Sequence, residues 1–379
     1  MRFIYADNAA TTRLSDRALE AMLPYLREEY GNASTLYKLG RSAHSAVASA
    51  RRTFADGIQA IPAEIFFTSG GTESDNWAIK GTAHRLARLG KRHIVTDNIE
   101  HHAVLNSASA LAREGFEITY VKADADGVVP PQAVRAAIRP DTALVSVMFA
   151  NNELGTIQPV AEIGRICHDA GVLFHCDAVQ AAGILPINVQ AMNIDLLSIS
   201  AHKFHGTKGV GVLYARRGCV PEVYIDGGEQ EYHHRAGTEN VAGIVGAAAA
   251  FAEALGEREH KAARLVQMRD EIQAGLLKIP EAVVNGANAA RLPGTLNMSF
   301  SGVDGQSLIF ALDSNGIAAS SGSACASGSI SPSHVLLALG LPYSLAHGSL
   351  RISLGRYNKS DEVNTVIQTV TRVITEMRA

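Results

Sequence analysis

Several features that would place a chain in a specialised class are scarce or missing in these 379 residues. No apolar run approaches the roughly 20 residues that cross a bilayer, and the first residues lack the apolar core of a secretory signal. Acidic and basic residues nearly balance, with a formal net charge of −3, so no basic face for nucleic acid is expected. We therefore expect a soluble, cytoplasmic protein that binds neither membrane nor nucleic acid.

Cysteine is also scarce, with four residues in the whole chain. No two of them have the C-x-x-C spacing of a zinc ribbon or a dithiol redox centre, so no permanent metal site is predicted. In a cytoplasmic chain they should be reduced thiols. Three lie among apolar residues, as core cysteines do, namely Cys167, Cys176 and Cys219. The fourth, Cys325, lies in a stretch of Ser, Gly and Ala.

Hydrophobic residues make up 47% of the chain, enough for one large domain and a smaller one. Short apolar runs alternate with longer, Ala-rich stretches of helical spacing. This alternation predicts an α/β fold with a mostly parallel sheet covered by helices on both faces. The expected strands cover residues 65–68, 93–96, 143–148, 172–175, 196–199 and 209–214.

The pattern changes after about residue 251. A charged, Ala-rich helix is expected over 252–277, followed by strands at 295–300 and 350–354 and a C-terminal amphipathic helix. We interpret this part as a smaller α+β domain. The predicted division is 15–255 for the large domain, and 1–14 with 256–379 for the small domain, which carries a cysteine loop at about 320–333.

Residues 68–74, Thr-Ser-Gly-Gly-Thr-Glu-Ser, lie between an expected strand and an expected helix. Two glycines let the backbone turn tightly and approach a ligand closely, and a helix N-terminus at that point binds phosphate. A strand-to-helix turn without any ligand has the same pattern, so this segment alone does not decide between them.

Two further residues follow apolar strands. Asp177 lies where ligands bind in an open α/β sheet, outside the carboxyl end of a strand, and suits a pyridinium nitrogen. A helix-capping aspartate is the alternative. Lys203 lies between His202 and a glycine-rich stretch, and lysine forms the Schiff base with pyridoxal phosphate. The alternative is an ordinary solvated lysine.

The Ser/Gly loop around Cys325 makes that thiol accessible, which suits a nucleophile that hands a group on. In this order, the four motifs resemble the NifS/IscS-type cysteine desulfurases, fold-type-I pyridoxal-phosphate enzymes related to class V aminotransferases. The resemblance runs from 5–12 to 350–356 and includes 100–105, 151–155 and 235–240. The segment 331–336 resembles the subgroup with the longer cysteine loop, which delivers sulfur to scaffold proteins directly.

The resemblance implies a sheet of the seven-stranded type in the large domain, and a role for each matching residue around pyridoxal 5′-phosphate. Lys203 forms the Schiff base, Asp177 pairs with the pyridine nitrogen, and Gln180 hydrogen-bonds the phenolic oxygen. His101 stacks on the ring and moves protons. The other cofactor residues that it implies are Gly71, Thr72, Asn152, Ser200, His202 and Thr238, of which Thr238 reaches the phosphate of the neighbouring subunit in a homodimer.

For the substrate, L-cysteine, the resemblance implies that Asn152 and Arg351 bind the carboxylate and that Asn32 lines the pocket. Cys325, as a thiolate, takes the substrate sulfur as a persulfide and alanine leaves. The catalytic residues are then Cys325, Lys203 and His101. The chain departs from the family pattern in having Ala33 and Thr207 where proline is common, and in 227–231.

Three rival functions share these residues: a selenocysteine lyase, another class V aminotransferase, and a catalytically silent scaffold. The sulfur acceptor is also open among an iron–sulfur scaffold, a tRNA-thiolation relay and a molybdenum-cofactor pathway. The resemblance favours iron–sulfur cluster assembly, whether housekeeping or dedicated to nitrogenase (nitrogen fixation). The persulfide on Cys325 would then also be a transient ligand of a nascent cluster.

Overall fold

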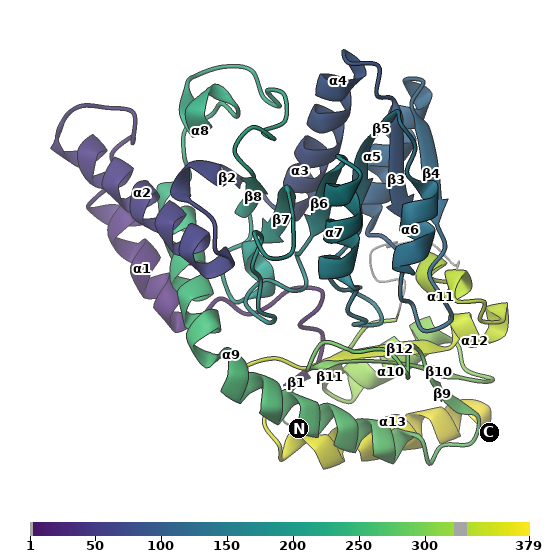
Figure 1. Ribbon diagram of the computed structural model, residues 1–379. Coiled ribbons are helices and arrows are strands. Elements are labelled where there is room, and N and C mark those ends of the chain that lie inside the picture. The colour runs from purple at the N-terminus through teal and green to yellow at the C-terminus, as the bar shows by residue number, and fades with distance from the viewer. Residues whose placement is uncertain (1–2, 322–331) are drawn as a thin grey trace.

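The computed structural model describes residues 3–321 and 332–379, so the predicted nucleophile Cys325 lies outside the described residues. Figure 1 shows a large sheet with helices on both faces, standing above a smaller layer of strands and helices that contains both ends of the chain. The long helix α9 (Val241–Leu276) runs along one side of the molecule and belongs to both parts. None of the helices in these ranges is long and apolar enough to cross a membrane.

The large sheet has seven strands in the order β2-β8-β7-β6-β5-β3-β4. The neighbours from β7 to β4 are parallel, whereas β8 runs antiparallel to both β7 and β2. The predicted mostly parallel sheet is therefore confirmed. The strands are β2 (Ile65–Thr68), β3 (His93–Asp97), β4 (Glu117–Val121), β5 (Thr142–Ser146), β6 (Leu173–Asp177), β7 (Leu196–Ser200) and β8 (Gly211–Ala215).

Alternate residues of these strands enter two separate cores, because successive side chains point to opposite faces of a sheet. Leu144 and Leu196 belong to one apolar cluster, and their neighbours Val145 and Leu197 belong to another. The first face is covered by α3 (Gly71–Asn76), α4 (Thr82–Ala87) and α5 (His102–Arg113), with the π-helical turn η2 (Trp77–Gly81). The second is covered by α2 (Lys38–Ile58), α7 (Val160–Asp169) and α9, while α6 (Pro131–Ala137) packs beside α7.

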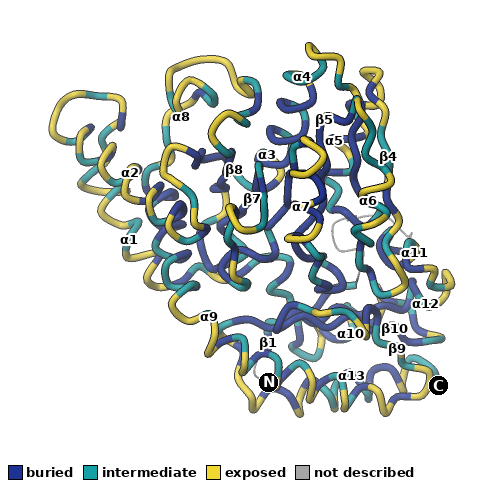
Figure 2. The backbone as a smooth tube through the Cα atoms, viewed as in Figure 1, coloured by how far each residue is buried: buried dark blue, intermediate teal, exposed yellow. Residues whose placement is uncertain are grey.

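The edge strand β4 was not among the expected strands. Its sequence, Glu-Ile-Thr-Tyr-Val, has no continuous apolar run, and only its last residue is buried. The other six strands of this sheet are almost entirely buried, as Figure 2 shows for the interior of the upper part. Strand β4 is an edge strand of which four of the five residues remain at least partly exposed, so its sequence carries a weaker hydrophobic signal than the buried strands do.

The smaller part has a three-stranded antiparallel sheet in the order β12-β10-β9. A second, two-stranded parallel sheet joins β1 (Ile4–Tyr5) to β11 (Ile317–Ala318), so the N-terminus is built into this part. Its core contains Met298, Ile352 and Val370. The remaining elements are β9 (Ala282–Val284), β10 (Thr295–Phe300), β12 (Ser349–Ser353), α10 (Gly305–Ser314), α11 (His334–Ala338), α12 (Tyr343–His347) and α13 (Glu362–Arg378).

Helix α9 crosses the predicted domain boundary at 255/256 without a break. Its first half, with Phe251 and Ala254, packs in the large core against α1 (Asp16–Arg27) and α2, and its second half, with Leu265 and Met268, packs in the small one. The division into two domains remains a prediction. Short helical turns complete the fold at η1 (Pro62–Glu64), η3 (Ala201–Lys203) and α8 (Gln230–His233).

Candidate active site

A cavity of about 300 Å³ lies at the carboxyl edge of the large sheet, where it faces the small part. Parallel strands end at the same edge, so residues far apart in sequence meet there. Asp177 is the last residue of β6 and Ser200 the last of β7. The cavity brings together Gly71, Thr72, His101, Asn152, Asp177, Gln180, Ser200, His202, Lys203 and Arg351.

Asp177 is the buried carboxylate of this cavity, with 6% of its surface exposed. Its Oδ1 accepts a hydrogen bond from the backbone N–H of Val179 at 2.8 Å. Burial raises the pKa of Asp177 to about 6, while the backbone hydrogen bond and the positive charge of Lys203 lower it. A buried carboxylate has lost its hydration. A cationic or proton-donating partner therefore stabilises its charged form more than it would stabilise a carboxylate in water.

His101 begins α5 as its N-cap, and its Nδ1 accepts a hydrogen bond from the N–H of Ala103 at 3.1 Å. Burial, with the nearby Lys203, lowers the pKa of His101 to about 4. The ring is therefore neutral at pH 7 and carries its proton on Nε2, since Nδ1 is used as an acceptor. A neutral imidazole can lie flat against an aromatic ring without adding charge to the cavity.

Lys203 is held by the backbone of the N-terminal segment. Its Nζ donates to the carbonyl oxygens of Ala9 at 2.6 Å and Ala10 at 2.8 Å. Gln180 Nε2 donates to the same Ala9 oxygen at 3.0 Å. These contacts were missed from the sequence because a backbone carbonyl has no residue-type signature, although this segment was part of the motif that carried the resemblance.

The turn after β2 forms the opposite end of the cavity. A Cβ at Gly71 would lie 2.6 Å from a methyl group of Val179, so only glycine fits there without a shift. The side chain of Ser200 lies against Gly71, and the ring of His202 is 3.1 Å from the hydroxyl of Thr11. The start of α3, the hydroxyls of Thr72 and Ser200 and the imidazole of His202 thus line the same cavity, a set of donors that suits a phosphate group.

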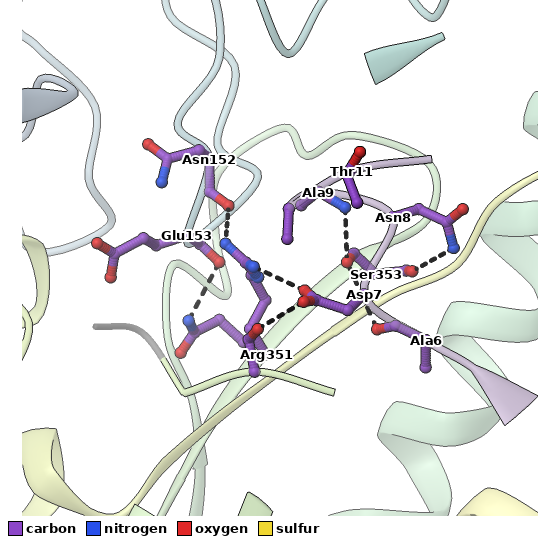
Figure 3. Close-up of polar contacts among 12 residues, drawn as sticks. Ala6, Asp7, Asn8, Ala9, Thr11, Asn152, Glu153, Arg351 and Ser353 are labelled. Carbon is purple, nitrogen blue, oxygen red and sulfur yellow. Dashed lines mark hydrogen bonds and ion pairs between the residues drawn. The ribbon is translucent and has the colours of Figure 1, made fainter. Parts of the chain in front are cut away.

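Arg351 lies on β12 with 2% of its surface exposed, and its guanidinium reaches the cavity from the small part. Nη2 donates to Asp7 Oδ1 at 2.7 Å, and Nη1 donates to the carbonyl oxygen of Asn152 at 2.9 Å. Figure 3 shows this guanidinium between the two partners. Its Nε has no hydrogen-bond partner among the described residues, so the fork keeps donor capacity for an anion.

Asp75 is a second buried carboxyl that lines the cavity and that sequence reasoning missed. Its Oδ1 lies 3.6 Å from His175 Nε2 and has no hydrogen bond within the described part of the chain. Burial, and then the charge of Asp177, raise the pKa of Asp75 well above its usual value. The two carboxyls therefore disfavour each other's charge, and burial disfavours a charge on Asp75 most strongly.

Three predicted residues are not in this cavity. Thr238 lines a separate cavity of about 140 Å³ near Ser69 and Arg235. Asn32 is exposed between α1 and α2, where its Oδ1 accepts from the N–H of Ser34 at 2.9 Å. Cys325 falls outside the ranges that the structure covers. Within those ranges, no group of three or more His, Cys, Asp and Glu side chains could hold a metal ion.

Comparison with known proteins identifies the family. Residues 4–366 match the model of the class-V aminotransferases. The chain belongs to this family. Within these class-V enzymes, a cysteine desulfurase IscS of Methanosarcina thermophila is 50% identical over 375 residues, which cover 99% of this chain and 93% of the relative.

Solved structures agree with this assignment. A NifS-like protein has a TM-score of 0.93 and 39% identity, covering 99% of this chain and 100% of its own. A structure described as SspA in complex with cysteine has a TM-score of 0.83 and 36% identity, covering 94% of this chain and 100% of its own. The predicted resemblance to the NifS/IscS-type cysteine desulfurases is confirmed at the level of the family, as is the prediction that the chain is an enzyme.

Proposed function

We propose that this class-V enzyme is a cysteine desulfurase that uses pyridoxal 5′-phosphate to convert L-cysteine to L-alanine and holds the sulfur as a persulfide on Cys325. The observation that carries the proposal is the convergence of Lys203, Asp177 and Arg351 on one cavity of about 300 Å³. The amine of Lys203 suits the aldehyde of the cofactor, and the carboxylate of Asp177 suits its pyridine nitrogen. The guanidinium of Arg351 suits the carboxylate of an amino acid.

The residues present fit the cofactor. The buried carboxylate of Asp177 would offer the pyridine nitrogen a negative partner, and burial raises the pKa of Asp75 beside it, which disfavours a second charge there. Gly71 lets the start of α3 pack against Val179, where a Cβ would clash, and it lines the cavity beside Thr72 and Ser200, which would hold the phosphate. The remaining contacts come from Thr72, Asn152, Gln180, Ser200 and His202, with neutral His101 against the ring.

When bound, pyridoxal phosphate draws electrons away from the substrate Cα, which makes its proton acidic. In the proposed reaction Arg351 and Asn152 hold the substrate carboxylate. The Lys203 amine removes the Cα proton and returns a proton to the carbon skeleton. His101, which is neutral, assists in moving protons through Nε2. The side chains of this protein therefore bind and orient the substrate and move its protons.

Sulfur transfer falls to Cys325. Its thiolate attacks the substrate sulfur, a new S–S bond forms as the C–S bond breaks, and L-cysteine plus one enzyme thiol become L-alanine plus one enzyme persulfide. Ser320 and Ser333 lie on either side of the segment that contains Cys325. Ser320 donates to Asp7, the partner of Arg351, and Ser333 donates to Glu153, next to Asn152. This placement supports Cys325 as the residue that serves the cavity.

The same proposal includes a homodimer in which Thr238 contacts the phosphate of the partner subunit's cofactor. Thr238 lines its own cavity, away from the one that holds Lys203, which supports a role outside its own active site. Asn32, exposed on the loop between α1 and α2, would likewise line the substrate pocket of the other subunit. Mixing a Thr238→Ala subunit with a Lys203→Ala subunit tests this, because one site of the hybrid dimer would then carry both defects.

The decisive experiment supplies L-cysteine with a reductant and measures alanine and sulfide. Equal amounts of both from the native protein, and neither from Cys325→Ala, are expected. Transfer of an amino group to a keto acid would instead identify an aminotransferase, and a strong preference for selenocysteine would identify a selenocysteine lyase. We further propose an iron–sulfur scaffold protein as the acceptor, which sulfur transfer from the labelled persulfide to a purified scaffold would test.

A further inference from the structure

Arg351 has one anionic partner that the proposed reaction does not use. Asp7 accepts from Nη2 through Oδ1 at 2.7 Å, and its other oxygen, Oδ2, accepts from the hydroxyl of Ser320 at 2.7 Å. The backbone of Asp7 is fixed as well, because its carbonyl accepts from the Tyr5 hydroxyl at 3.0 Å. Both carboxylate oxygens and the backbone carbonyl of Asp7 therefore accept hydrogen bonds, so Asp7 holds the guanidinium in one orientation (Figure 3).

A second buried carboxyl, that of Glu153, belongs to the residue after Asn152, whose carbonyl oxygen accepts from Arg351 Nη1. Glu153 is 6% exposed, and its Oε2 accepts a short hydrogen bond from Ser333 Oγ at 2.5 Å. Burial raises the pKa of Glu153 to about 7, and the charge of Arg351 lowers it. An Arg351 released from Asp7 would turn toward Glu153 and favour its ionisation, since a buried carboxylate is stabilised most by a guanidinium partner.

Arg351 would then lose its place in the cavity. In the present arrangement Nη1 and Nη2 point to Asn152 and Asp7, and Nε is a buried donor without a partner in the described residues. A substrate carboxylate in the cavity meets donors that are already oriented. If the guanidinium turned to Glu153, the carboxylate would first have to break a buried ion pair, which weakens binding.

We propose that Asp7 is a positioning residue for substrate recognition: it keeps the Arg351 fork turned to the cavity and away from Glu153, and so sets the preference for an amino acid over an amine without a carboxylate. This inference rests on the proposed function, in which Arg351 binds the substrate carboxylate. Asp7 itself does not contact the substrate.

The test compares L-cysteine with cysteamine, which lacks the carboxylate, in a Cys325→Ala background where binding is not followed by sulfur transfer. Dissociation constants come from the absorbance of the bound cofactor and, independently, from the shift of the thermal unfolding midpoint. We expect Asp7→Ala to lower the preference for L-cysteine about tenfold, since one oriented ionic contact is worth that much in affinity. Asp7→Asn keeps an amide oxygen that can accept from Nη2, so its preference for L-cysteine should fall less than that of Asp7→Ala.

Ser353→Ala is the matched control. Ser353 Oγ holds the N–H of Ala9 at 2.9 Å, so this change loosens the same N-terminal segment without touching Arg351. The preference for L-cysteine should stay near native in Ser353→Ala and should recover in the double variant Asp7→Ala/Glu153→Gln, which removes the competing anion. An unchanged preference in Asp7→Ala, an equal loss in Ser353→Ala, or no recovery in the double variant would each overturn the inference.

Failure of the proposed function is a separate result. A native protein that releases neither alanine nor sulfide from L-cysteine refutes the desulfurase assignment. A native protein that releases both, with Asp7→Ala retaining its full preference for the carboxylate, refutes only the role of Asp7.

Discussion

The guanidinium of Arg51 on α2 and the carboxylate of Glu231 form a buried, bidentate ion pair, with Nη1–Oε2 at 2.6 Å and Nη2–Oε1 at 2.8 Å. Glu231 Oε2 also accepts from the N–H of Phe67 at 2.9 Å, and the guanidinium lies over the rings of Phe67 and Tyr232. This pair ties α2, β2 and the segment that leads to Thr238 into one unit, so it supports the surface from which Thr238 is proposed to act.

Removing one partner of this pair should be costly. Glu231→Ala leaves the Arg51 cation buried and unpaired, and we expect a loss of about 3–5 kcal/mol in the free energy of unfolding. The control is Asp169→Ala, which breaks the exposed Arg165–Asp169 pair and should cost less than about 0.5 kcal/mol. Denaturant unfolding curves measure both, and similar losses in the two variants would contradict the assigned role of Glu231.

The turn that carries Glu231 has an unusual backbone. Glu231, Tyr232 and His233 are consecutive non-glycine residues with φ of 46°, 57° and 67°. Because a left-handed conformation costs roughly 1–2 kcal/mol for a residue with a Cβ, and His233 is exposed, His233→Gly should stabilise the protein by up to about 1 kcal/mol after the entropic cost of glycine. The matched change His234→Gly, at a φ of −103°, should give no gain in thermal unfolding midpoint.

Glu153 should make stability depend on pH. Its pKa is about 7 in the folded protein against an ordinary value of 4.5, so its contribution is full below about pH 4.5 and is lost as the pH rises through about 7. The side chain of Gln in Glu153→Gln does not titrate. This variant should therefore lack the contribution of Glu153 to the change in the free energy of unfolding with pH, which is at most about 1.4 kcal/mol for each pH unit. Urea midpoints of both proteins from pH 5 to pH 8 check it; parallel curves would show that Glu153 does not titrate in that range.

Asp177 should matter for rate more than for cofactor retention. Asp177→Asn keeps an oxygen for the N–H of Val179 but loses the negative charge that is proposed to pair with the pyridine nitrogen. We expect kcat for alanine formation to fall by at least about 100-fold, the usual effect of deleting one electrostatic contact to the reacting group. Absorbance measures the bound cofactor. The control is Asp195→Asn, which removes the partner of Arg216 outside the cavity and should leave kcat near native.

The order of strands and helices could be predicted because buried parallel strands are continuous apolar runs, as in β5 and β7. Strand β4 could not, since its sequence mixes polar and apolar residues and only its last residue is buried. The start of α9 was placed at 252, although the helix begins at Val241. Residues 241–251 are small and apolar on all sides, because this stretch is buried between α1 and α2, and they show no helical periodicity.

The sequence by itself determined the family and indicated most residues of the cavity, because Asp177 ends one buried strand and Lys203 closely follows another at the same edge of the sheet. The contacts of Asp7, Ala9, Asp75 and Glu153 were decided only by the tertiary structure. Asp7 meets Arg351 across 344 positions of sequence, and Ala9 meets Lys203 across 194 through a backbone carbonyl. Whether a carboxyl in this site is charged, paired or neutral depends on burial and on neighbours brought together by folding, and no local pattern records either.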